Sequence, residues 1–157
     1  MCGIIGCNKN RLNEIKQALK TIKYRGPDHT KIYNDNNFTL GHNRLSIIDL
    51  NSTANQPMSD INKEIYIVFN GEIYNYKKIK IKLSKKYKFK TNSDTEVLIY
   101  AYKEWGVKLT KYLQGMYSFA IYDKLIKKIF LFRDPVGIKP LYYYKDNNSF
   151  IFCSEIK

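Results

Sequence analysis

The order of helix-like and strand-like segments constrains the fold of this chain more than any other feature of its sequence. Apolar residues recur at intervals of three and four residues over 11–23 and again over 76–87, which predicts two amphipathic helices. Ser93 and Glu96 have the spacing of a capping box, with Glu96 reaching back to the N–H of Ser93, and they open a third predicted helix that ends at Gly106. Strands are predicted for the short apolar runs bounded by turn residues, at 2–6, 31–33, 38–40, 64–69, 117–122, 129–132, 141–144 and 150–153. Strands on both sides of a helical middle predict an α+β fold with antiparallel sheets.

Size and composition indicate one soluble domain. The chain has 157 residues, of which 44% are hydrophobic and 26% charged, as in ordinary globular proteins. No apolar run approaches the roughly 18 residues of a membrane span, and the N-terminus has no apolar signal region. The three cysteines, Cys2, Cys7 and Cys153, are scattered and lack the spacing of metal ligands. We therefore expect a cytoplasmic protein with no metal and no membrane partner.

The chain is strongly basic, which raises the question of nucleic acid. It has 27 Lys and Arg against 14 Asp and Glu, a net charge of +13, but only four of the basic residues are arginines. The best candidate for nucleic acid, the lysine-rich stretch 77–90, carries its aromatic residues on the apolar face of a predicted helix, where they belong to the core. We interpret the charge as lysines on solvated faces and expect no specific nucleic acid partner; a basic nucleic-acid-binding protein remains a remote alternative.

Cys2 follows directly after Met1 and is the first candidate for chemistry. If Met1 is removed, Cys2 has both a thiol and a free α-amine. An α-amine titrates at roughly 7.7–8.0 and a thiol at about 8.5, so the amine can accept the proton of the thiol and activate it as a nucleophile. The alternative is that a cysteine at position 2 has no function.

Seven strings along the chain carry a family resemblance. They are Cys2-Gly3-Ile4, Arg25-Gly26-Pro27-Asp28, residues 41–49 (GHNRLSIID), residues 70–75 (NGEIYN), Ser93-Asp94-Thr95-Glu96, residues 115–120 (GMYSFA) and residues 133–142 (RDPVGIKPLY). Together they resemble the N-terminal glutaminase domain of glutamine-hydrolysing asparagine synthetase, a class II glutamine amidotransferase, over essentially the whole chain. Related amidotransferases share the N-terminal cysteine, but the strings at 25–28 and 70–75 favour the asparagine branch.

The resemblance implies a fold and a reaction. The fold is that of the N-terminal-nucleophile hydrolases, a four-layer αββα sandwich with two antiparallel sheets. The reaction is hydrolysis of L-glutamine to L-glutamate and ammonia through a γ-glutamyl thioester on Cys2. In the family, a C-terminal synthetase domain then uses ATP to make asparagine with that ammonia.

The resemblance also assigns the site. Asn70 and Gly71 form the oxyanion hole, Arg44 holds the α-carboxylate of glutamine through a bidentate pair, and Asp94 accepts its α-ammonium. The pocket is completed by Glu72 and by the backbone of Leu45, Ser46, Ile47 and Ile48.

Each assignment has a structural alternative. Asn70-Gly71 could be a hairpin turn after the strand predicted to end at Phe69, although the residues that follow are helical in pattern. Asp94 could only complement a helix dipole. Arg25 and Asp28 are expected to shape the loop over Cys2, and the two histidines, His29 and His42, are assigned structural roles because an N-terminal nucleophile needs none.

We expect residues 1–157 to form a single type 2 glutamine amidotransferase domain that is C-terminally truncated relative to the family. The Ser-Gly-Gly-x-Asp-Ser nucleotide loop of the synthetase domain is absent, so ATP and magnesium would belong to that missing domain and no cofactor is expected here. Three explanations stay open: a fragment of a longer protein, a stand-alone glutaminase that supplies a separate synthetase subunit, or a vestigial product that only binds glutamine or a partner.

Overall fold

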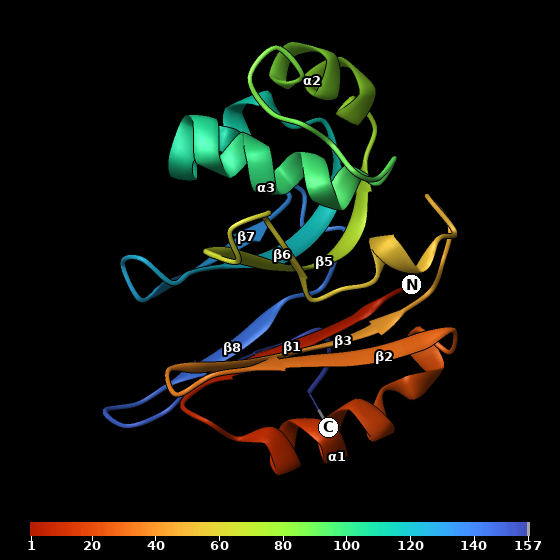
Figure 1. Cartoon of the computed structure of the whole chain (residues 1–157). Helices are drawn as coiled ribbons and strands as arrows, with labels where there is room; N and C mark the ends of the chain where they lie inside the picture. Colours follow the sequence, from red (N-terminus) through yellow and green to blue (C-terminus); the bar gives the residue numbers. More distant parts are fainter. Residues whose placement is uncertain (157) are drawn as a thin grey trace.

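The computed structural model describes residues 1–156 and has four layers (Figure 1). Two antiparallel sheets face each other in the middle. Helix α1 (Leu12–Thr21) covers the outer face of one sheet, and helices α2 (Tyr76–Leu83) and α3 (Asp94–Trp105) cover the outer face of the other (Figure 1). The predicted α+β sandwich and all three predicted helices are confirmed. Within residues 1–156, none of the helices has the length and hydrophobicity of a membrane span.

The first sheet has five strands in the order β2-β3-β1-β9-β8. Their bounds are Gly3–Asn8 for β1, His29–Asn34 for β2, Phe38–Arg44 for β3, Tyr142–Lys145 for β8 and Phe150–Cys153 for β9. Strand β1 lies in the centre, paired with β3 and β9. Cys2 therefore directly precedes the central strand of this sheet, near the end of the chain that is marked N in Figure 1.

The second sheet has the order β4-β5-β6-β7. Its strands are Met58–Ser59 for β4, Ile65–Ile73 for β5, Gly115–Asp123 for β6 and Lys128–Arg133 for β7. The prediction that the strand at 64–69 ends at Phe69 was wrong, because β6 pairs with β5 through Gly71 and on to Ile73. A Cβ on Gly71 would lie 2.2 Å from the carbonyl oxygen of Met116, so glycine is what allows β6 to approach there.

Side chains along β5 alternate between two cores. Ile65, Ile67 and Phe69 pack under the helices, whereas Tyr66 and Val68 pack between the sheets. Because the side-chain period of a strand is two, Asn70 continues the inner series and faces the sheet that carries Cys2. The sequence of β5 thus directs this amide between the layers.

Helix α3 is fixed at both ends. At its start the Ser93 hydroxyl accepts the Thr95 N–H at 3.1 Å, as predicted for the cap. Glu96 does not reach back to Ser93; its carboxylate instead accepts the N–H groups of Lys90 and Thr91 in the turn before the helix, at 2.9 and 2.7 Å.

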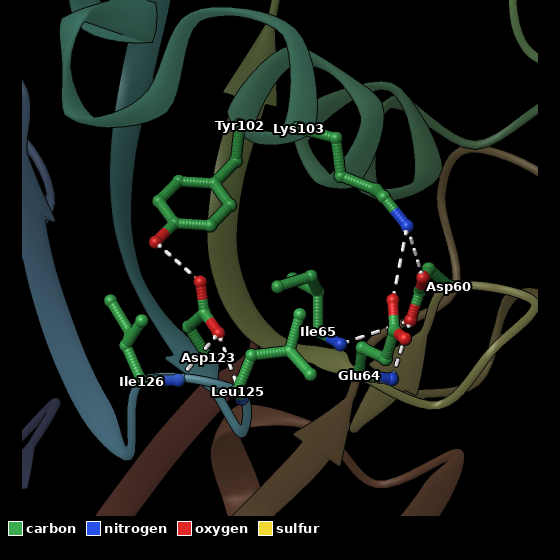
Figure 2. Close-up of polar contacts among 8 residues, drawn as sticks. All are labelled: Asp60, Glu64, Ile65, Tyr102, Lys103, Asp123, Leu125 and Ile126. Atoms are coloured by element: carbon green, nitrogen blue, oxygen red, sulfur yellow. Dashed lines mark hydrogen bonds and ion pairs between the residues drawn. The ribbon is translucent and has the colours of Figure 1, made fainter.

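Near the other end of α3, polar side chains join the helix to the second sheet (Figure 2). Tyr102 donates to Asp123 at 3.0 Å, and the Lys103 ammonium lies 2.6 Å from Asp60 and 3.6 Å from Glu64. These contacts hold the helix whose first residue is Asp94.

Candidate active site

A pocket of about 160 Å³ lies where four distant segments meet. Its walls come from Met1 and Cys2, from the loop that follows β3, from residues 69–72 of β5 and from residues 93–95 at the start of α3. All of the predicted site residues line it except Ser46, whose N–H donates to the Asp28 carboxylate at 2.7 Å.

The Cys2 thiol is half-buried at one wall of this pocket. Its sulfur accepts the N–H of Leu45 at 3.4 Å and donates to the carbonyl of the same residue at 3.6 Å. Burial raises the pKa of the Cys2 thiol, even though the Leu45 N–H, the terminal ammonium and Arg44 act in the opposite direction. A thiol of this kind is neutral near pH 7, so it needs a base to become a nucleophile.

The backbone at Cys2 is held by the Arg-Gly-Pro-Asp segment. The Nε of Arg25, a residue only 8% exposed, donates to the Cys2 carbonyl at 3.0 Å, and its guanidinium also pairs with Glu155. Gly26 packs so closely on β3 that a Cβ would lie 2.3 Å from the carbonyl oxygen of Asn43. Arg25 and Asp28 thus contact the residues on either side of the thiol, Cys2 itself and the loop that begins at Leu45.

Asn70 presents an amide donor that the protein does not use. The residue is 1% exposed, and within residues 1–156 its Nδ2 has no hydrogen-bond partner. Four buried side-chain atoms of the described chain share this property, and Asn70 is the one whose residue lines the pocket. Leaving a buried donor unpaired costs about 1–3 kcal/mol, which points to an acceptor that arrives with a ligand.

The N–H of Gly71 is free of the sheet for a geometric reason. Its partner in the register, Tyr117, turns its own N–H and C=O to Asp134, at 3.2 and 2.9 Å. Gly71 and Tyr117 therefore form a non-hydrogen-bonded pair, and the Gly71 N–H points away from β6. Strand β4 pairs with β5 only at Met58 and Ser59, so it ends before it can cover Gly71.

Arg44 is 5% exposed, and most of its donors serve the loop beside the pocket. Its Nη atoms donate to the carbonyl of Asn51 at 3.0 Å, to the side chain of Asn55 at 2.7 Å and to the carbonyls of Ile48 and Asp49. The sequence predicted a bidentate edge turned to a carboxylate. In the structure that edge organises the loop, and Arg44 brings its charge to the pocket wall.

Asp94 and Glu72 contribute two carboxyl groups to the lining of the pocket. Asp94 is 4% exposed and its carboxylate accepts the N–H of Ile73 at 3.1 Å. Burial raises the pKa of Asp94 to about 6, and the charge of Glu72 adds to the rise against the N–H groups of Ile73 and Thr95. A cation between the two carboxyls would stabilise the charged form of Asp94 against both its burial and its repulsion by Glu72.

Other residues bear on which chemistry the site supports. Neither His29 nor His42 lines the pocket, and residues 1–156 contain no group of three His, Cys, Asp or Glu placed to hold a metal ion. Two buried residues for which we predicted no role, Gln56 and Lys139, also line the pocket. Their signal in the sequence is weak, since Gln56 belongs to none of the seven strings and Lys139 lies inside a longer one, at 133–142.

Comparisons with known proteins agree with this geometry. A model described as the glutamine amidotransferase domain matches residues 1–157. Asparagine synthetase (glutamine-hydrolyzing) 1 of Bacillus subtilis is 41% identical, with 100% of this chain and 26% of the relative covered. Asparagine synthetase B (glutamine-hydrolyzing) of Escherichia coli is 37% identical, with 100% and 29% covered. The chain thus spans under a third of the length of these two relatives.

A solved structure supports the fold. The glutamine phosphoribosylpyrophosphate amidotransferase of Bacillus subtilis, complexed with ADP and GMP, superposes with a TM-score of 0.80 at 20% identity. The match covers 98% of this chain and 42% of that one. At that identity the likeness extends to the architecture and no further.

Proposed function

The chain belongs to the glutamine amidotransferase domain family, and from this premise we propose that it hydrolyses L-glutamine to L-glutamate and ammonia. One observation carries the proposal: the unpaired, buried Nδ2 of Asn70 belongs to the same pocket as the Cys2 thiol. A nucleophile with an unused donor beside it is the arrangement that acyl transfer requires.

The proposed chemistry begins when Met1 is removed. The free α-amine of Cys2 takes the proton of Sγ, and the thiolate attacks the side-chain amide carbon of glutamine. The carbonyl electron pair moves to oxygen, where Asn70 Nδ2 and Gly71 N–H receive it. One such donor contributes about 3–4 kcal/mol to the transition state.

The second half of the reaction releases the products. The ammonium formed on Cys2 gives its proton to the leaving nitrogen, the C–N bond breaks, and ammonia departs from a γ-glutamyl thioester. The same amine then takes a proton from water, and the hydroxide attacks the thioester carbon. The C–S bond breaks with the proton returned to sulfur, which restores Cys2 and frees glutamate.

The two charged ends of the substrate match charged groups in the lining of the pocket. The α-carboxylate is drawn to the side of Arg44, and the α-ammonium to Asp94 and Glu72. The loop 45–48 closes the pocket between them. Recognition of both ends would make the site selective for a free amino acid.

The names of the relatives extend the proposal to the fate of the ammonia. We propose that it serves asparagine synthesis in the cytoplasm, on a synthetase domain that belongs either to a longer form of this chain or to a separate subunit. ATP and magnesium would be needed there and not at Cys2.

The test uses protein whose Met1 removal is verified by mass spectrometry. It should release glutamate from glutamine, and a diazoketone analogue of glutamine should label it once. C2A should lose both reactions. C153A is the matched control, because Cys153 is also half-buried but lies in β9 outside the pocket, and it should keep both. Turnover in C2A, or none in the processed wild type, would refute the proposal.

A further inference from the structure

The backbone of Phe69 is held by two buried side chains where a neighbouring strand would otherwise lie. Strand β4 pairs with Ile67 and Tyr66 and ends there. Beyond it, the Phe69 N–H donates to Gln56 Oε1 at 2.6 Å, and the Phe69 carbonyl contacts His42 Nε2 at 3.1 Å. Phe69, the residue directly before Asn70, thus has both of its backbone polar groups satisfied by side chains.

His42 reaches this carbonyl from the other sheet. It lies on β3 opposite Ile4, two residues after Cys2, and its side chain is 0% exposed. Burial lowers the pKa of His42 to about 3, so the ring is neutral and carries one N–H. Because Phe69 offers an acceptor, that hydrogen is on Nε2, and the bare Nδ1 has no partner in the described chain.

Gln56 connects Phe69 to the start of α3, which forms another wall of the pocket. Its Nε2 donates to the hydroxyl of Thr95 at 3.1 Å, next to Asp94 in the first turn of α3. These contacts therefore link the first sheet, strand β5 and helix α3, which carry Cys2, the two donors and Asp94.

We propose that His42 is a positioning residue that fixes the distance between the Cys2 thiol and the donors on Asn70 and Gly71, an inference that rests on the proposed function. It does not line the pocket and touches no substrate. Its contact crosses between the layers one residue before Asn70, so its loss frees the end of β5 to shift relative to β1.

The kinetic test compares three variants. H42L removes the donor and should lower kcat for glutamine by about 100-fold, the effect of misplacing a catalytic group by about 1 Å, with KM nearly unchanged. H42Q restores an amide donor and should recover most of the rate. N43L is the matched control: Asn43 is also 0% exposed on β3, but its amide donates to Leu19 on the α1 side, so kcat should stay close to that of the wild type.

A double-mutant cycle separates positioning from general damage. If His42 acts through the oxyanion donors, H42L should lower the rate far less in an N70A background than in the wild type. If H42L lowers the rate by the same factor in the N70A background as in the wild type, the inference is overturned. Should H42L fail to fold, H42N takes its place, because its shorter amide does not reach the Phe69 carbonyl.

A measurement independent of turnover keeps the two proposals apart. Amide hydrogen exchange at Phe69 and Asn70 should be faster in H42L than in N43L of equal melting temperature. Equal exchange would overturn the positioning role even in an active enzyme. A wild type that shows no hydrolysis but has the faster exchange in H42L would refute the proposed function and leave the role of His42 in placing β5 intact.

Discussion

The D94N substitution measures how much free energy of unfolding the protein loses by keeping a buried acid at its pocket. Asp94 is 4% exposed, and burial raises its pKa from 3.8 to about 6. Between these values the folded chain holds a proton that the unfolded chain has released. Stability therefore falls as the pH rises from 3.8 to about 6, and stays at the lower level above that range.

The magnitude follows from the size of that change. At about 1.4 kcal/mol per pH unit, a rise from 3.8 to about 6 corresponds to about 3 kcal/mol. Asparagine has no charge to bury and can still accept the N–H of Ile73, so D94N should be more stable by up to this amount above pH 7 and by almost nothing at pH 4. For a chain of this size, the difference is about 6–12 °C in Tm.

Thermal melts of both proteins at pH 4 and pH 8 provide the assay, and calorimetric titration with glutamine shows whether the same change abolishes binding. D60N is the matched control, since Asp60 is also 4% exposed. Burial alone would raise the pKa of Asp60, but the Ile65 N–H, Lys103 and the Glu64 N–H hold it below its usual value, so D60N should destabilise the fold. The reasoning would be refuted if D94N were no more stable than the wild type at pH 8. A difference in stability between the two proteins that is the same at pH 4 and pH 8 would also refute it.

Three further outcomes are expected. N70A should lower kcat by about 100–1,000-fold without lowering Tm, because it removes a donor that has no internal partner, and steady-state kinetics with melts would check both. G71A should destabilise the fold by about 3 kcal/mol in urea titrations, since its Cβ would meet the Met116 carbonyl at 2.2 Å; wild-type stability would contradict the close approach of β6. KM for glutamine should rise as the pH falls through about 6, because a protonated Asp94 loses its attraction for the substrate ammonium, and a KM that stays flat from pH 8 to pH 5 would exclude that pairing.

Local patterns in the sequence were sufficient for most of the fold. The helical spacing over 11–23 and 76–87 predicted α1 and α2, because the side that faces a sheet must be apolar in any fold. The Ser93 cap was also a local event, settled by two residues in one turn. The candidate site residues were predicted by resemblance, and all of them except Ser46 line one pocket.

What the sequence could not predict depends on contacts between distant residues. The end of β5 was misplaced because Asn70, Gly71 and Glu72 look like a turn, yet β6 extends along them and holds them in the sheet. His42 was predicted to have a structural role, but its partner could not be predicted, and Gln56 was not predicted to have any role. The reason is the same, since they contact Phe69 across 27 and 13 residues of chain. Predictions from local sequence patterns fail most often at functional sites, because the residues there do not all serve local structure.

The buried acids, taken together with Asn70, indicate the site without reference to any relative. Away from the pocket, buried acids are satisfied: Asp60 has Lys103 and two N–H groups, and Asp123 has the Tyr102 hydroxyl (Figure 2). At the pocket, Asn70 keeps an unused donor and Asp94 a raised pKa. A free amino acid with a side-chain amide supplies what each lacks, an oxygen that becomes negative for Asn70 and an ammonium for Asp94. These two groups destabilise the protein without a ligand, and one ligand matches both. Selection for stability alone would have replaced them, so their presence indicates selection for binding.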